Sequence, residues 1–265
     1  MSAPAVHRYG PHPDQFLELT VPDGIGPHPV AVVLHGGFWR AAYGVELARP
    51  LAADLAAAGW AAVAVEYRRV GAGGGWPATL DDVAAALDAL PELPGAERLD
   101  LGAVTVIGHS AGGHLAAWAA GRHRLPAGAP GAGPRVRPAA AVLQAGVLDL
   151  ERAAGQRMGD GAVTDFFGAT PAEAPDRYAA ADPVRLLPTG ARVLLVHGAG
   201  DSTVVPEQSE RYATAATAAG DRVELRVVPG DHMVLVDPAG EPWRLVRRWV
   251  TAGATDGRDG PTLVP

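Results

Sequence analysis

The chain of 265 residues is 48% hydrophobic and 19% charged, and its formal net charge is −7. This length is ordinary for a single large α/β domain, and the apolar content is enough for a sizeable core. All 22 basic residues are arginines and they form no run or stripe, so nothing indicates a nucleic-acid or anionic-membrane partner. Because cysteine and lysine are both absent, disulfides, thiolate nucleophiles, cysteine-bound metals, Schiff-base chemistry and a P-loop are excluded.

The first 15 residues, MSAPAVHRYGPHPDQ, contain no apolar stretch of the kind that a signal peptide needs. No apolar run in the chain approaches the length of a membrane span. We therefore expect a cytoplasmic protein.

Strands and helices are predicted to alternate along the chain. Residues 16–22, FLELTVP, resemble an antiparallel edge strand that precedes the core. The runs that predict core strands are 28–37, 60–69, 101–109, 139–146, 191–198 and 221–228. The segments with helical spacing are 46–59, 79–90, 111–121, 206–220 and 242–250. Short continuous apolar strands between amphipathic helices predict a mostly parallel central sheet with helices on both faces, in one domain over residues 1–252.

Three segments interrupt this alternation. Residues 125–138 are rich in glycine and proline and are predicted to form a surface loop. Residues 147–190 read as a long irregular insertion over the active edge of the sheet, where such insertions often act as lids or binding loops. Residues 253–265 are predicted to be a disordered tail.

A serine lies at the junction of a predicted strand and a predicted helix in residues 106–118, VIGHSAGGHLAAW. Gly108, Ser110 and Gly112 fit the pattern G-x-S-x-G, the nucleophile elbow. The glycines allow the strand and the helix to approach closely around the serine. A simple turn serine is the alternative, but the strand before it and the helix after it are the context that the motif requires. We therefore predict that Ser110 is a nucleophile.

A serine hydroxyl needs a base, and the base needs an acid to orient it. In this kind of fold the acid and then the histidine follow the serine along the chain. Asp201 and His232 follow the last two predicted strands, at the edge of the sheet where ligands bind in open α/β folds. Asp149 is a rival acid, whereas Asp231 adjoins the histidine and is badly placed to reach its ring. We predict Asp201 as the acid and His232 as the base.

Acyl transfer also requires hydrogen-bond donors for an oxyanion. The backbone N–H of Ala111, directly after the nucleophile, is one expected donor. The segment LHGGFW, residues 34–39, occupies the position of the glycine-rich oxyanion motif of lipases and esterases. A strand-ending turn is the alternative for this segment. Its place upstream of the elbow predicts the backbone N–H groups of Gly37 and Phe38 as the other donors.

Several large side chains lie in loops that are predicted to reach the active edge. Packing in the core is their alternative role, but their concentration there indicates a small apolar or aromatic acyl substrate. The predicted pocket residues are Trp39, Tyr43, Trp76, His109, Phe166, Phe167 and Met233. His109 and His114 are five residues apart, which does not match a helical metal-binding pair, and we predict no metal.

Together, the segments LHGGFW, VEYRR, WPATLDDV, GHSAGGHLAAW, AGDSTVVPEQS and GDHMVLVDP resemble an α/β-hydrolase of the esterase/lipase group. The resemblance spans roughly residues 8–250 and is greatest to the kynurenine formamidase-like and BD-FAE-like branch. It implies the α/β-hydrolase fold and a Ser–Asp–His hydrolase that needs no metal or organic cofactor. Phe38 stands where some relatives have a third glycine, so activity on tertiary-alcohol esters is not expected. Met233 stands where relatives often carry phenylalanine.

The leading functional hypothesis is a carboxylic-ester hydrolase that works through an acyl-enzyme. An arylformamidase or amidase, such as a kynurenine formamidase, would use the same residues, so the motifs leave this alternative open. A non-catalytic binding protein on the same fold is a third hypothesis, but such a protein normally loses part of the triad. The expected partner is a small-molecule ester or amide, with no nucleic acid and no membrane, and the protein is expected to be a monomer or a homodimer.

Overall fold

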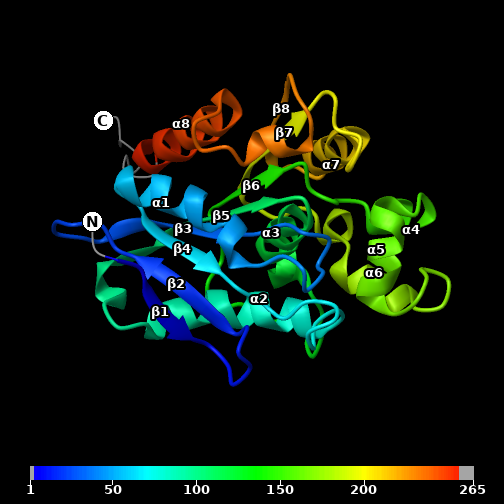
Figure 1. The fold of residues 1–265 in the computed structure, drawn as a ribbon, viewed down its shortest axis with the longest axis horizontal. Coiled ribbons are helices and arrows are strands. Elements are labelled where there is room, and N and C mark those ends of the chain that lie inside the picture. Colours follow the sequence, from blue (N-terminus) through cyan, green and yellow to red (C-terminus); the bar gives the residue numbers. More distant parts are fainter. Residues whose placement is uncertain (1–2, 257–265) are drawn as a thin grey trace, which may run out of the picture.

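The computed structural model describes residues 3–256, which form a sheet with helices packed on both of its faces (Figure 1). Its eight strands run in the order β1-β2-β4-β3-β5-β6-β7-β8. Their bounds are β1 Ala5–Arg8, β2 Phe16–Thr20, β3 His28–Leu34, β4 Ala61–Val65, β5 Leu99–His109, β6 Ala140–Gln144, β7 Arg192–Gly198 and β8 Arg222–Val228. The strands from β4 to β8 in this order pair in parallel, whereas β1 and β2 are antiparallel. The predicted mostly parallel sheet and the α/β-hydrolase fold are therefore confirmed.

The antiparallel strand predicted at residues 16–22 is present as β2, but it is not the edge of the sheet. The edge is β1, a strand that the sequence analysis did not predict. β1 has only four residues and three of them are exposed, so it carries too little apolar pattern to be recognised.

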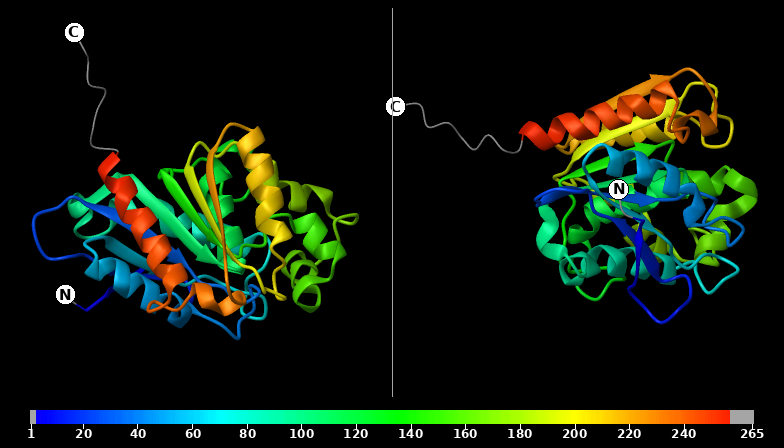
Figure 2. Two further views of the ribbon diagram at one scale, coloured as in Figure 1. Left: turned by 90° about the horizontal axis from the view of Figure 1, so that it is seen from above. Right: turned by 60° about the vertical axis from the view of Figure 1, so that its left-hand side comes forward.

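Both faces of the sheet are buried, and this explains the continuous apolar strands. In β3, Val30, Val32 and Leu34 pack into one core, while Ala31 and Val33 pack into the other. The first core also holds residues of α2 (Ala78–Ala89), α3 (Ala111–Gly121) and α7 (Glu207–Ala218). The second holds residues of α1 (Arg49–Ala57) and α8 (Glu241–Asp256). Figure 2 shows α7 and α8 on opposite sides of the strands between them.

Residues 147–190, expected to be irregular, contain three short helices. These are α4 (Leu150–Gly155), α5 (Met158–Phe167) and α6 (Pro175–Ala181), and they lie beyond the carboxyl ends of the parallel strands (Figure 1). Left-handed backbone at Arg157 and at residues 159–161 interrupts the helical period, which hid these helices from the sequence pattern.

The C-terminal part of the chain differs from expectation at one boundary. α8 continues through Asp256, so the first residues of the tail predicted at 253–265 are helical. Residues 257–265 lie outside the described part of the chain. Among the described residues, no helix combines the length and apolar character that crossing a membrane would need.

A buried histidine joins the loop after β3 to the 147–190 insertion. The indole N–H of Trp39 donates to His114 Nδ1 at 3.2 Å, and His114 Nε2 lies 3.0 Å from the carbonyl oxygen of Ala181. A carbonyl only accepts, so Nε2 carries the proton and Nδ1 is bare. Burial lowers the pKa of His114 to about 4, so the ring is neutral under physiological conditions.

This histidine makes the stability of the fold depend on pH. In the unfolded chain His114 is protonated below its ordinary pKa near 6.5. In the native protein it is protonated only below about pH 4. The contribution of His114 to the free energy of unfolding is therefore fully present above pH 6.5. It decreases by about 3 kcal/mol as the pH falls toward 4. We expect His114→Gln to have a shallower fall in unfolding free energy over this range, measured by urea unfolding at several pH values. An equal dependence of unfolding free energy on pH in wild type and His114→Gln would contradict the lowered pKa of His114.

Candidate active site

Ser110 lies in the sharp turn between β5 and α3, with φ 56° and ψ −120°. Such a positive φ is costly for a residue with a side chain and is typically retained at functional sites. The N–H of Ser110 donates to the carbonyl oxygen of Gln144 on the neighbouring β6 at 2.8 Å, which holds the turn against the sheet.

The two glycines of the elbow are required by the closeness of the backbone around the serine. A Cβ atom on Gly108 would lie 1.9 Å from the carbonyl oxygen of Gly112, and one on Gly112 would lie 2.1 Å from that of Leu34. Real Cβ atoms essentially never come within 3.0 Å of another heavy atom. The G-x-S-x-G pattern therefore follows from the packing of α3 against the ends of β5 and β3.

Asp201 and His232 meet at the same edge of the sheet. Asp201 lies in the loop after β7, and His232 begins the short 3₁₀ helix η6 (His232–Leu235) after β8. The His232 Nδ1–H donates to Asp201 Oδ2 at 2.6 Å. The other oxygen, Oδ1, accepts the backbone N–H groups of Thr203 and Val204 at 2.8 and 2.9 Å.

His197, near the end of β7, also faces Asp201, although its sequence context predicts no role for it. Its Nε2 lies 2.7 Å from the carbonyl oxygen of Val204 and 3.3 Å from Asp201 Oδ2, and its Nδ1 lies 2.7 Å from Ser209 Oγ. Its spacing of four residues before Asp201, at a strand end on the active edge, was the available signal. Burial raises the pKa of Asp201, but the hydrogen bonds from His197 and His232 outweigh burial and hold that pKa well below its ordinary value.

The two rival acids are occupied elsewhere. Asp149 caps α4 by accepting the N–H of Arg152 at 3.1 Å, and its other oxygen pairs with Arg211. Asp231 accepts the N–H of Met233 at 3.0 Å at the start of η6. Of these three carboxylates, Asp201 is the one that is hydrogen-bonded to the His232 ring.

His109 supports the ring of His232. The two ring centroids are 4.4 Å apart, and His109 Nε2 lies 2.9 Å from the carbonyl oxygen of His232. Burial, followed by the electrostatic influence of the adjacent His232 ring, lowers the pKa of His109 to about 3. His109 is therefore a neutral donor that restrains the loop carrying His232.

The backbone of the HGGFW segment adopts left-handed conformations, so its amides take no part in a helix or strand. Gly37, Phe38 and Trp39 have φ values of 110°, 55° and 56°. In the part of the chain that the structure describes, the N–H groups of Gly37 and Phe38 donate to no protein acceptor. Ala111 is the first residue of α3, where a helix leaves its N–H groups unpaired. These three amides are therefore free to bind an oxyanion.

A buried cluster of His35, Glu66 and Arg69 stabilises the start of this segment. His35 Nε2 lies 3.0 Å from Glu66 Oε1, which also pairs with Arg69 at 2.8 Å. The Tyr67 ring stacks on His35, and its hydroxyl donates to the His35 carbonyl oxygen at 2.7 Å. Burial raises the pKa of Glu66, but the bond with His35 and other donors lower it overall, so the carboxylate stays ionised. The cluster ties the end of β4 to the start of the HGGFW segment.

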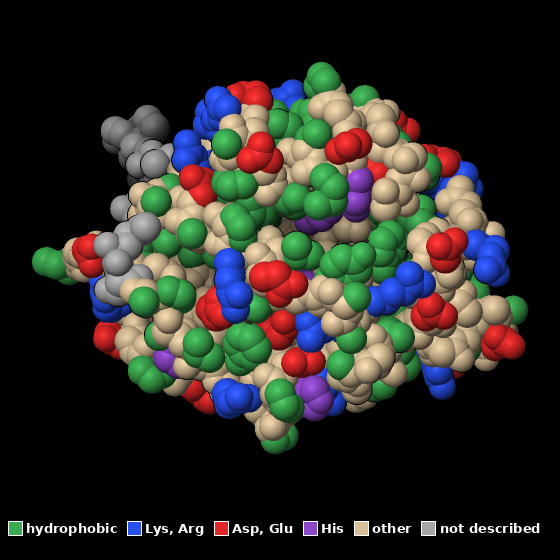
Figure 3. Space-filling view, viewed as in Figure 1, with side chains coloured by type: hydrophobic (Ala, Val, Ile, Leu, Met, Phe, Trp, Pro, Cys, Tyr) green, Lys and Arg blue, Asp and Glu red, His purple; other side chains and the backbone are tan. Residues whose placement is uncertain are grey.

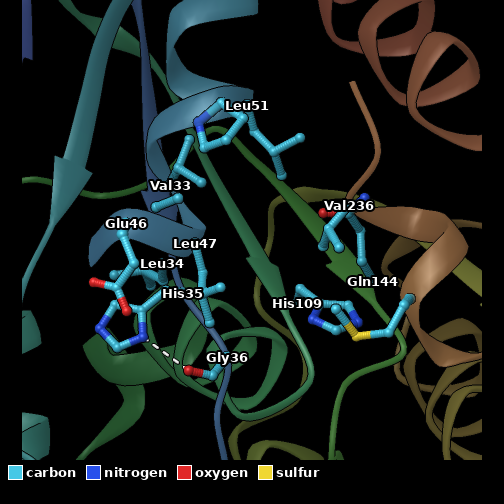
Figure 4. A pocket seen from close by; sticks show the side chains of 13 residues that line it. Val33, Leu34, His35, Gly36, Glu46, Leu47, Leu51, His109, Gln144 and Val236 are labelled. Carbon is cyan, nitrogen blue, oxygen red and sulfur yellow. Dashed lines mark hydrogen bonds between the residues drawn. The ribbon is translucent and has the colours of Figure 1, made fainter. Parts of the chain in front are cut away.

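A cavity of about 160 Å³ opens beside these residues, between α1 and η6 (Figure 4). Of the residues predicted to form a pocket, His109 and Met233 line it. Figure 3, viewed from the same side as Figure 1, shows histidine side chains in a hollow near the middle of the molecule.

The other predicted pocket residues have different surroundings. Trp39, Phe166 and Phe167 are buried in the core, where the Trp39 and Phe166 rings lie 5.1 Å apart. Trp76 is half-buried against Phe167, and Tyr43 is exposed beside Gly37. The sequence pattern of these five aromatic residues did not distinguish packing in the core from contact with a substrate. Within residues 3–256, no group of three or more His, Asp or Glu residues is arranged to hold a metal ion.

Comparison with known proteins agrees with this geometry. The family model BD-FAE matches residues 17–215, and the chain belongs to this family of carboxylesterase-type hydrolases. The resemblance to the BD-FAE-like branch is thus confirmed. No curated protein matches the chain in sequence.

Solved structures share the fold at low sequence identity. A truncated carbohydrate esterase from gut microbiota has a TM-score of 0.81 at 21% identity, over 96% of this chain and 97% of the other. A carboxylesterase from Lactobacillus plantarum has a TM-score of 0.75 at 21% identity, over 96% and 98%. An acetyl ester-xyloside bifunctional hydrolase from Caldicellulosiruptor lactoaceticus has a TM-score of 0.75 at 25% identity, over 90% and 88%.

The close packing of the elbow predicts a sharp difference between two glycine substitutions. Gly112→Ala places a methyl group against the Leu34 carbonyl and should lower the free energy of unfolding by about 3 kcal/mol or more. Gly155→Ala, at the end of α4 with open space around it, should change stability by less than about 1 kcal/mol. Urea unfolding followed by circular dichroism measures both. Equal stability of the two variants would contradict the packing argument.

Proposed function

We propose that the protein is a serine hydrolase of small carboxylic esters, in which Ser110 is the nucleophile, His232 the base and Asp201 the acid. The observation that carries this proposal is the 2.6 Å bond between His232 Nδ1 and Asp201 Oδ2, formed at the same sheet edge as the strained turn of Ser110. With Nδ1 engaged by the carboxylate, His232 has Nε2 free to take a proton.

In the first half of the reaction, Ser110 Oγ forms a bond to the ester carbonyl carbon while its proton moves to His232 Nε2. The carbonyl electron pair moves onto oxygen, and the backbone N–H groups of Gly37, Phe38 and Ala111 hold the oxyanion. The intermediate collapses, the bond to the alcohol oxygen breaks, and His232 returns the proton to that oxygen. The products are a free alcohol and an acyl-serine.

In the second half, water attacks the acyl carbon and gives a proton to His232. The bond to Ser110 Oγ then breaks, the serine recovers its proton, and the carboxylic acid leaves. The ionised Asp201 stabilises the imidazolium form of His232 in both halves, because its carboxylate is held charged by four donors. Each oxyanion donor is expected to contribute about 3–4 kcal/mol to the transition state.

The proposed substrate is an ester with a small acyl group. Among the similar structures, a thermophilic esterase from Thermogutta terrifontis holds propionate in one structure and butyrate in another. The burial of Trp39, Phe166 and Phe167 in the core supports a short acyl group over a bulky aromatic one.

An arylformamidase is the second candidate. It would use the same nucleophile, base and oxyanion donors with an arylamine as the leaving group. A formyl group is as small as a short acyl group, so the preference for a small acyl group supports both activities equally. A non-catalytic binding role is disfavoured, because the chain retains a serine, an aspartate and a histidine in the expected order, with His232 bonded to Asp201.

Replacing the triad residues should separate catalysis from mere binding. Ser110→Ala should lower kcat for p-nitrophenyl acetate by about a million-fold. Asp201→Asn should lower it by about ten-thousand-fold, because the His232 ring loses its charged partner. Asp149→Asn is the matched control, and we expect it to stay within about threefold of wild type because that carboxylate caps α4 and pairs with Arg211 rather than with His232.

Assaying N-formylkynurenine beside p-nitrophenyl acetate distinguishes the two candidate activities by their kcat/KM ratio. Full activity in Ser110→Ala, or an equal loss in Asp149→Asn and Asp201→Asn, would overturn the triad assignment.

A further inference from the structure

The cavity between α1 and η6 has a wall that the triad and the oxyanion segment do not use. Val33 at the end of β3, together with Ala48 and Leu51 at the start of α1, forms one side. Val236, directly after η6, lies on the other side (Figure 4), and Met233 of η6 also lines the cavity. The lining is predominantly apolar, and the volume of about 160 Å³ is that of a cavity that accepts a benzene-sized molecule.

The polar groups around the cavity are mostly engaged within the protein. Both ring nitrogens of His35 have partners, in Glu66 and in the Gly36 carbonyl. Glu46 accepts the N–H of Gly44, and Gln144 Nε2 donates to the Leu235 carbonyl at 2.6 Å. Among the fully buried side-chain atoms of this lining in the described part of the chain, only Gln144 Oε1 lacks a partner. A sugar ring would need several free donors and acceptors here, so the lining selects an apolar group.

The mouth of the cavity carries exposed apolar side chains. Leu47, at the end of the 3₁₀ helix η1 (Val45–Leu47), is 39% exposed, and Met233 is 55% exposed. Exposed apolar side chains at a cavity that borders a catalytic site are typical of a ligand entrance.

The position of the cavity relative to His232 decides which half of an ester it faces. His109, whose ring packs against His232, lines the cavity, and so does Met233, the residue after His232. In acyl transfer the protonated histidine must lie next to the oxygen of the departing alcohol. The cavity therefore adjoins the loop that carries His232, the proposed proton donor to the departing alcohol.

We propose that this cavity binds the apolar group of the leaving alcohol, with a preference for a ring or branched chain of about six carbons. This inference rests on the proposed function and extends it: the preferred substrates are esters of benzyl-type or branched C4–C6 alcohols, rather than sugar esters. The acyl group lies outside this cavity, so changes to its lining act on alcohol selectivity alone.

Two series of esters test this proposal. The first keeps an acetyl group and varies the alcohol from ethyl to benzyl to 2-naphthylmethyl, and the second keeps ethanol and compares acetate with butyrate. We expect kcat/KM for benzyl acetate to exceed that for ethyl acetate by at least about tenfold, and the naphthylmethyl ester to fall back because it exceeds the cavity. A wild-type enzyme with no preference for benzyl over ethyl would overturn the proposal.

Substitutions in the lining test the location. Ala48→Leu fills the cavity and Leu47→Trp covers its mouth, and each should lower the benzyl-to-ethyl ratio about tenfold while the butyrate-to-acetate ratio stays unchanged. Ile25→Trp, a fully exposed position in the loop between β2 and β3, is the matched control and should leave both ratios as in wild type. A shift in the butyrate-to-acetate ratio instead would place the acyl group in the cavity and contradict the proposal.

Direct binding of benzyl alcohol, measured by ligand-observed NMR on the full chain, separates this inference from the proposed function. Binding to wild type that is lost in Ala48→Leu supports the cavity assignment even if no ester is cleaved, and in that case the proposed function alone fails. Thermal unfolding of each variant shows that it is folded. Equal binding to folded wild type and Ala48→Leu would overturn the assignment whatever the activity.

Discussion

The close approach of α3 to the ends of β5 and β3 is the constraint on which the rest of the site depends. With Gly108 and Gly112 in place, the backbones come close enough for Ser110 to be held at a positive φ, above the sheet edge. The same approach sets the first turn of α3 against the backbone of Leu34 and His35, at the start of the HGGFW segment. A side chain at either glycine would separate these elements and displace Ser110 from its place at the sheet edge.

The electrostatics of the site depend on an acid that is kept charged although it is buried. Asp201 is 5% exposed, and an unpaired carboxylate at that depth would be neutral. Two backbone N–H groups and the two histidines His197 and His232 provide the compensation. The second cluster, around Glu66, serves the HGGFW segment in the same way. The protein thus uses ionised carboxylates to fix the geometry of loops that have no regular structure.

Much of this arrangement is predictable from the sequence, because some patterns have one physical solution. Apolar strands between amphipathic helices require a covered parallel sheet, and G-x-S-x-G between strand and helix requires the tight elbow. The role of Glu66 was not predictable, because it depends on a contact with His35, which follows a neighbouring strand and is 31 residues away in the chain. His197 offered only its spacing of four residues before Asp201, which by itself assigns no role. The helices of the insertion were hidden by left-handed residues, and the burial of Trp39, Phe166 and Phe167 could not be told from exposure by residue type alone.

The central claim is that Ser110 is an activated nucleophile, and covalent labelling tests it most directly. The protein is treated with diethyl p-nitrophenyl phosphate, and its intact mass and then its peptide masses are measured. The account predicts one diethylphosphoryl group per chain, located on Ser110, and slow labelling when Asp201 is replaced by asparagine. Absence of labelling in the folded wild-type protein, or a label on another residue with Ser110 unmodified, would contradict it.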